Sequence, residues 1–161
     1  MSQYIPLVIY LDTNIVIGVL TMPDGVRLSE FLNSSDKFLK FTEASTNDGI
    51  IEQMNDIYIN KETIKFVKTL DENDGRGCGS SNYWKVKKIP VRTKMLLTDY
   101  ELSGNLHREN EEEILQLIEK TFSFLPCTEV KLRHIRSNMV SDAGFVAINR
   151  DKVHSMRIAV N

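Results

Sequence analysis

Residues 18–44, "GVLTMPDGVRLSEFLNSSDKFLKFTEA", return in altered form at residues 104–130 as "GNLHRENEEEILQLIEKTFSFLPCTEV". The two stretches align without a gap at an offset of 86 residues, which places Gly18 on Gly104. The other identities are few: Leu20 on Leu106, Phe38-Leu39 on Phe124-Leu125 and Thr42-Glu43 on Thr128-Glu129. Self-similarity at a fixed offset is typical of a repeated structural unit, so we expect the chain to contain an internal duplication.

Each copy carries apolar residues at the spacing i, i+3, i+4. This spacing places three side chains on one face of a short amphipathic helix. The residues concerned are Leu28, Phe31 and Leu32 in the first copy and Ile114, Leu117 and Ile118 in the second. We expect helices over 26–33 and 110–120, with Asp24 and Asn110 as N-caps, because short polar side chains accept hydrogen bonds from free helical amides.

Apolar segments flank each predicted helix, and the match extends beyond it: "IYINKETI" (57–64) falls on "VAINRDKV" (146–153) after three inserted residues. The strands predicted are 6–12, 14–21, 37–45 and 56–67, then 91–98, 100–107, 122–135 and 144–160. Gly18 and Gly104 lie inside apolar strands, where glycine usually marks a bulge, a sharp bend or the close approach of another backbone segment. The predicted fold class is α+β and β-rich: an internal duplication of a β-β-α-β-β unit, each a small, strongly bent antiparallel sheet or open barrel.

The segment "DENDGRGCGSSNYW" (71–84) is polar, rich in glycine and without apolar periodicity, as linkers are. We therefore expect a first repeat unit at 1–70, a linker at 71–88 and a second repeat unit at 89–161. The length of 161 residues suits one ordinary domain or two small ones.

The overall charge indicates no particular class of partner. A formal net charge of −2 creates no global field that would attract nucleic acid or an anionic membrane. The segment "KVKKIPVRTK" (85–94) is nevertheless locally basic. Two cysteines without a C-x-x-C pair, and no apolar run near the ~20 residues that span a bilayer, favour a cytoplasmic protein with no membrane contact.

The opening "YLDTNIVIGVL" (10–20) resembles the first strand of PIN-domain ribonucleases, which delivers an aspartate to a metal site. That resemblance would make Asp12 the first metal ligand. The repeat favours another interpretation, because the position that matches Asp12 in the second unit is Thr98, and both segments read as strand, polar turn and strand. We therefore expect a hairpin turn at Asp12, no catalytic residues, no metal site, no cofactor and no enzymatic activity.

The order of features in each unit is similar to that of the Sm and Sm-like family. The matching pieces are "YLDTNIVIGVLT", "FLKFTEA" and "IYINKETIKFV" in the first unit, and "LLTDYELSGNLH", "FSFLPCTEV" and "FVAINRDKVHSM" in the second. The resemblance implies a small bent barrel with a helix inserted between strands. It also implies that the turns Asn60-Lys61 and Asn149-Arg150 stand where Sm-like proteins place a basic loop that contacts RNA.

Three functions remain open at this stage. The favoured one is a non-catalytic interaction or scaffold protein, whose modules bind a protein partner or self-associate through sheet edges. The first alternative is binding of RNA or single-stranded nucleic acid, with stacking on Trp84; its other residues would be Asn60, Lys61, Lys85, Lys87, Lys88, Arg92, Lys94, Asn149 and Arg150. The second alternative, which we favour least, is a PIN-like metal-dependent ribonuclease.

Overall fold

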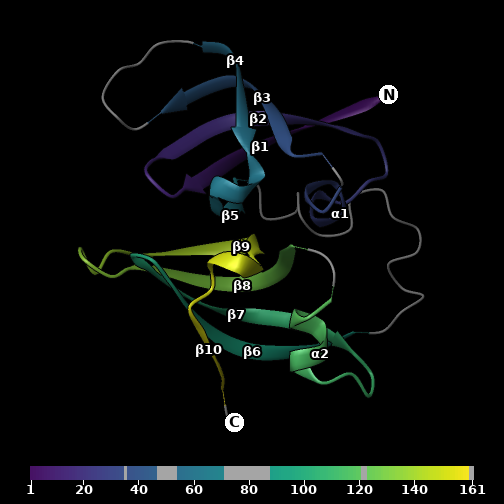
Figure 1. The fold of residues 1–161 in the computed structure, drawn as a ribbon, viewed down its shortest axis with the longest axis vertical. Coiled ribbons are helices and arrows are strands. Elements are labelled where there is room, and N and C mark those ends of the chain that lie inside the picture. The colour runs from purple at the N-terminus through teal and green to yellow at the C-terminus, as the bar shows by residue number, and fades with distance from the viewer. Residues whose placement is uncertain (35, 47–53, 71–87, 121–122, 160–161) are drawn as a thin grey trace.

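The computed structural model describes residues 1–34, 36–46, 54–70, 88–120 and 123–159. Ten strands form one antiparallel sheet in the order β10-β6-β7-β8-β9-β5-β1-β2-β3-β4. Among the described residues β10 and β4 do not pair with each other, so the sheet is not closed into a barrel. In this order the second half of the chain supplies the first five strands, β10-β6-β7-β8-β9, and the first half supplies the other five, β5-β1-β2-β3-β4 (Figure 1).

The same elements occur in the same order in both halves. The first half contains β1 (Ser2–Leu11), β2 (Ile15–Pro23), α1 (Leu28–Leu32), β3 (Phe38–Thr46), β4 (Met54–Asn60), the 3-10 turn η1 (Lys61–Thr63) and β5 (Ile64–Thr69). The second contains β6 (Lys88–Leu97), β7 (Tyr100–Glu109), α2 (Ile114–Ile118), β8 (Phe124–His134), β9 (Val140–Asn149), η2 (Arg150–Lys152) and β10 (Ser155–Ile158). No helix in these described segments is long and apolar enough to cross a membrane.

The strand registers repeat as well. Ile9 faces Val67 across β1 and β5, and the residues at the matching positions, Met95 and Met156, face each other across β6 and β10. The register of β1 with β2 likewise matches that of β6 with β7, and the register of β3 with β4 matches that of β8 with β9. The two halves are therefore alike in pairing as well as in element order.

The two glycines expected to bend a strand lie at breaks of register. The β2–β3 ladder shifts between Ile17 and Val19, around Gly18, and the β7–β8 ladder shifts around Gly104. On the facing strands Glu43 and Glu129 both have φ of 52°, the local conformation of a residue in a bulge. Each glycine thus lies opposite a register shift whose extra residue belongs to the facing strand, β3 or β8, and not to the glycine's own strand.

The predicted unit lacked one strand. The segments 56–67 and 144–160, each predicted as a single strand, are divided by η1 and η2 into β4 with β5 and β9 with β10. The prediction was wrong because apolar residues continue on both sides of the turn. At the turn Asn60 accepts a hydrogen bond from the Glu62 amide, 3.0 Å long, and the chain passes from β4, which pairs with β3, to β5, which pairs with β1.

The helices are also shorter than predicted, one turn each, and they begin later. Their N-caps are Arg27 and Glu113 rather than Asp24 and Asn110. The Arg27 amide donates to Glu30 at 3.3 Å, and the Glu113 amide donates to Gln116 at 2.9 Å. A carboxylate or amide three residues into the helix thus satisfies the first free amide in place of a short polar cap.

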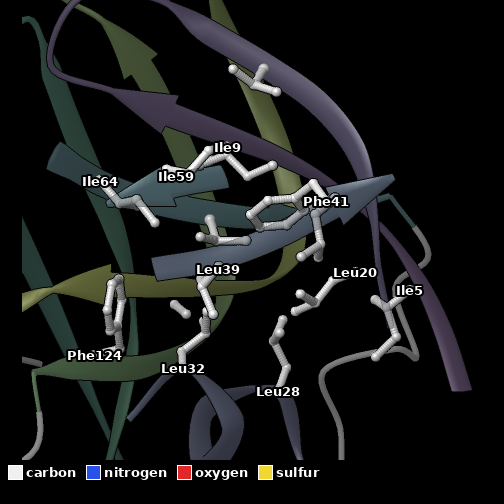
Figure 2. Packing of buried hydrophobic residues seen from close by; sticks show 14 of the residues in the cluster. Ile5, Ile9, Leu20, Leu28, Leu32, Leu39, Phe41, Ile59, Ile64 and Phe124 are labelled. Atoms are coloured by element: carbon white, nitrogen blue, oxygen red, sulfur yellow. The ribbon is translucent and has the colours of Figure 1, made fainter. Parts of the chain in front are cut away.

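The described residues form two apolar cores, one for each half, and each core includes residues from the other half. Phe124, Phe145 and Ala147 of the second half belong to the core of the first, and Phe66 of the first half belongs to the core of the second. Figure 2 shows Phe124 beside Leu32 of α1. The linker predicted at 71–88 lies outside the described residues except for Lys88, where β6 begins.

Candidate interaction surface at the two ends of the sheet

The halves meet where β5 pairs with β9. Phe66 faces Ile148, Val67 faces Ala147 and Lys68 faces Val146. We call this contact, together with the packing of α1 on β8, the internal junction. Its side chains alternate between the two faces of the sheet, so that Val67 and Ala147 enter the first core whereas Phe66 enters the second. The junction therefore belongs to both cores.

Polar contacts fix the internal junction. The Asn33 side chain, at the end of α1, donates to the Phe124 carbonyl at 2.9 Å and accepts from the Phe124 amide at 2.7 Å. Asn149, which is buried, donates to the Ile64 carbonyl at 2.9 Å. Because an asparagine amide both donates and accepts, Asn33 satisfies both backbone groups of the first residue of β8.

An ion pair and an aromatic cluster complete the internal junction. The Lys152 ammonium of η2 lies 2.9 Å from the Asp12 carboxylate in the β1–β2 turn. Tyr10 stacks on Phe66 with 4.2 Å between ring centroids, and Tyr100 of the second half meets both rings edge-on. Burial, and then the neighbouring Tyr100, raise the pKa of Tyr10. Both phenols therefore stay neutral near pH 7 and pack as apolar groups.

The ends of the sheet lack such a partner. Strand β4 pairs only with β3, and β10 pairs only with β6, in the part of the chain that the structure describes. Phe38 and Tyr58 are 54% and 64% exposed at the β4 end, and Ile158 of β10 is exposed at the other end. A strand with unpaired backbone groups and exposed apolar side chains is a template for pairing with another chain.

Several residues predicted for nucleic-acid binding instead make contacts within the chain. The Lys61 ammonium lies 2.9 Å from the Ser34 carbonyl and the Arg150 guanidinium donates to the Lys120 carbonyl, so each cation binds the free carbonyl groups that follow a helix. Burial lowers the pKa of Lys61, an effect that nearby Asp36 partly opposes. Asn60 and Asn149 organise the turns that precede η1 and η2.

The basic stretch is divided between described and undescribed residues. Arg92 donates to the Glu129 carbonyl at 2.9 Å, Lys94 lies 3.6 Å from the Glu101 carboxylate, and Lys88 is exposed at the start of β6. The predicted Trp84, Lys85 and Lys87 lie outside the described residues. Lys88, Arg92 and Lys94 stand at alternating positions of β6 and therefore lie on one face of that strand, where Arg92 and Lys94 contact Glu129 and Glu101.

Asp12 lies in the turn predicted for it and is exposed. Its carboxylate pairs with the Lys152 ammonium, and the described residues contain no group of three or more His, Cys, Asp or Glu side chains that could hold a metal ion. Cys127 is buried against Gly104, and burial raises its pKa to about 12, so that it remains a thiol under ordinary conditions.

Sequence reasoning missed the residues of the internal junction. Asn33 and Phe124 are separated by 91 positions, and no local pattern couples them. One signal was available: Asn33 aligns with Glu119, a change of chemistry inside an otherwise similar pair of segments. A contact made by one copy and not by the other is a reason for two repeats to differ at one position.

The comparisons with known proteins add no relative. No protein-family model, no curated protein and no solved structure matches this chain.

Proposed function

We propose that this chain is a non-catalytic interaction or scaffold protein. In this proposal it consists of two copies of a small, strongly bent, Sm-like β-rich module, joined to each other by strand pairing. Its free edges, β4 and β10, bind a protein partner by the same kind of pairing.

The observation that carries the proposal is the exposed apolar surface on unpaired strand edges. Tyr58 projects from β4 and Phe38 lies opposite the end of that strand on β3, facing Asn60 in the register. Proteins commonly protect an edge with charge, proline or a covering element. Here the exposed aromatic side chains favour a surface that a partner covers.

Photo-crosslinking in the cells that express the protein tests this proposal. A benzophenone amino acid replaces Tyr58 at the β4 edge or, as a matched control, Tyr4 on β1, which is 68% exposed and lies away from both edge strands. We expect protein adducts at Tyr58 and far fewer at Tyr4. Equal yields at the two positions, or none at Tyr58, would contradict a role for the β4 edge.

A further inference from the structure

We propose that the partner at these edges is a second copy of this chain, bound head to tail, with β4 of one copy added to β10 of the next. This inference rests on the proposed function and specifies it. Its basis is that the internal junction is itself a contact between the two repeats, and the elements on each side of it recur at the free ends of the sheet.

The repeat predicts the register of the contact. Strand β9 corresponds to β4 and β10 corresponds to β5, so the pairs seen between β5 and β9 can be transferred position by position. Val67 facing Ala147 becomes Met156 facing Tyr58 of the neighbouring copy. The flanking pairs become Ser155 with Ile59 and Arg157 with Ile57.

The side chains at the β4 end have the exposure expected of this arrangement. Phe124 is 1% exposed because α1 covers it, whereas its counterpart Phe38 is 54% exposed. Ala147 is fully buried in the core of the other half, whereas its counterpart Tyr58 is exposed. At both positions the buried side chain is the one with a second repeat beside it.

The β10 end of the sheet, to which β4 of the neighbouring copy would be added, shows the complementary difference in side-chain burial. In α1, Leu28 and Leu32 are fully buried, and Phe124 packs in their cluster. Their counterparts in α2, Ile114 and Ile118, are only partly buried. Met156 on β10 is also partly buried against the same core. A neighbouring copy would place Phe38 on α2 and Tyr58 beside Met156.

The polar contacts are only partly reproduced, which predicts a weaker contact than the internal junction. Asn60 can donate to the Val153 carbonyl of the neighbouring copy as Asn149 donates to Ile64. Glu119, however, replaces Asn33, and a carboxylate accepts a hydrogen bond from the Phe38 amide but cannot donate to its carbonyl. We therefore expect reversible association that depends on concentration.

Other replacements also predict a weaker contact than the internal junction. Leu96 and Ser155 take the places of the stacked Tyr10 and Phe66, and Thr98 and Thr63 of the neighbouring copy take the places of the Asp12–Lys152 ion pair. The contact is heterologous, because it joins two different surfaces. Repetition of such a contact yields a ring if the rotation closes and a filament if it does not.

Engineered disulfides test the register. Facing residues of an antiparallel pair have Cα atoms about 4.5 to 5.5 Å apart, which suits a disulfide. Tyr58→Cys and Met156→Cys are made as separate proteins on a Cys78→Ala background, which leaves only the buried Cys127. We expect covalent dimers when the two proteins are mixed under mild oxidation, and few when either is oxidised alone.

Tyr4→Cys mixed with Met156→Cys controls for random collision, since Tyr4 is as exposed as Tyr58. Dimers of Tyr58→Cys alone at the rate of the mixture would overturn head-to-tail pairing in favour of symmetric pairing of β4 edges. A mixture no faster than the Tyr4→Cys control would overturn the register.

Sedimentation velocity tests the contacts away from the strand. Phe38→Ser is expected to weaken association at least about tenfold, since a buried aromatic anchor often dominates an interface. Leu115→Ser is the matched control, because Leu115 is 58% exposed on α2 but its counterpart Ser29 adds no side chain to the apolar cluster. Glu119→Asn restores the amide of the internal junction and is expected to tighten association severalfold.

These results are separable from the proposed function. Equal effects of Phe38→Ser and Leu115→Ser, or a purified protein that stays monomeric at high concentration, would overturn the second copy as partner. If photo-crosslinks at Tyr58 then joined the chain to a different protein, the proposed function would stand and this inference would fail. An absence of Tyr58 adducts would contradict both.

Discussion

The two halves of the molecule share element order and strand register, but two matching positions of their helices differ in burial. Leu28 and Leu32 of α1 are buried in the cluster that includes Phe124 of the other half, whereas Ile114 and Ile118 of α2 are partly exposed. The sequences of the two helices have the same apolar spacing. Burial therefore depends on the neighbour of each repeat as much as on the repeat itself.

The largest predicted difference between the halves is at the paired phenylalanines. Phe124→Ala is expected to lower the free energy of unfolding by about 3 to 5 kcal/mol, because a buried ring leaves a cavity between α1 and β8. Phe38→Ala, on a side chain that is more than half exposed, is expected to change it by less than about 0.5 kcal/mol. Urea unfolding of both variants at low protein concentration measures this, and similar losses would show that the two positions are equivalent.

The next largest difference between the halves is expected in the loss of unfolding free energy when each strand glycine is replaced by alanine. A Cβ on Gly104 would lie 2.5 Å from the Cys127 sulfur and 2.9 Å from Val130, whereas a Cβ on Gly18 would meet nothing closer than Phe41 at 3.3 Å. Because of this overpacking, Gly104→Ala is expected to lower the free energy of unfolding by about 1 to 3 kcal/mol, and Gly18→Ala by less than about 1 kcal/mol.

Cys127→Ala provides the control for the glycine prediction. Removal of the sulfur takes away the nearest obstacle, so the loss caused by Gly104→Ala should shrink in that background, as a double-mutant cycle would measure. Additive losses would mean that the crowding at Gly104 comes from Val130 or the Thr128 carbonyl instead.

Most strands and both helices within a repeat could be predicted from the sequence, and the contact between repeats could not. The apolar spacing around Leu28 is a local signal, and a helix forms there, although it is shorter than predicted. The turn at Asn60 was noticed, but the apolar pattern on its two sides hid the separation of β4 from β5. The pairing of β5 with β9, on which the candidate surface depends, joins residues about 80 positions apart and has no local signal.

The polar link of the internal junction gives the third prediction. Asn33→Ala removes both hydrogen bonds to Phe124 and is expected to cost about 1 to 2 kcal/mol, since two partly buried backbone groups lose their partner. Glu119→Ala, at the matching exposed position of α2, should cost under about 0.5 kcal/mol in the monomer. Thermal unfolding at low protein concentration compares them, and a larger loss at Glu119 would mean that its side chain has a role within its own half.

The smallest predicted effect is the pH dependence of one ion pair in the second half, Glu101 with Arg133, whose carboxylate has no counterpart in the first half. A hydrogen bond from Arg133, 2.9 Å long, is the main reason that the pKa of Glu101 is lowered, with Lys94 adding to it. The matching residue of the first half is Ile15, which cannot ionise. A carboxylate with a lowered pKa in the folded state stabilises the fold above its ordinary pKa of about 4.5, and this stabilisation is lost as the pH falls through the folded-state value.

Because the pair lies near the surface, its contribution is expected to be a few tenths of a kcal/mol and at most about 1 kcal/mol. The difference in unfolding free energy between the native protein and Glu101→Gln should therefore be largest near pH 7 and close to zero near pH 2. In an Arg133→Gln background the same difference should lose most of its pH dependence, because the main cause of the lowered pKa is gone. If the dependence persisted there, Lys94 would be the partner that matters, and the contact between β7 and β8 would contribute less to this half than the geometry indicates.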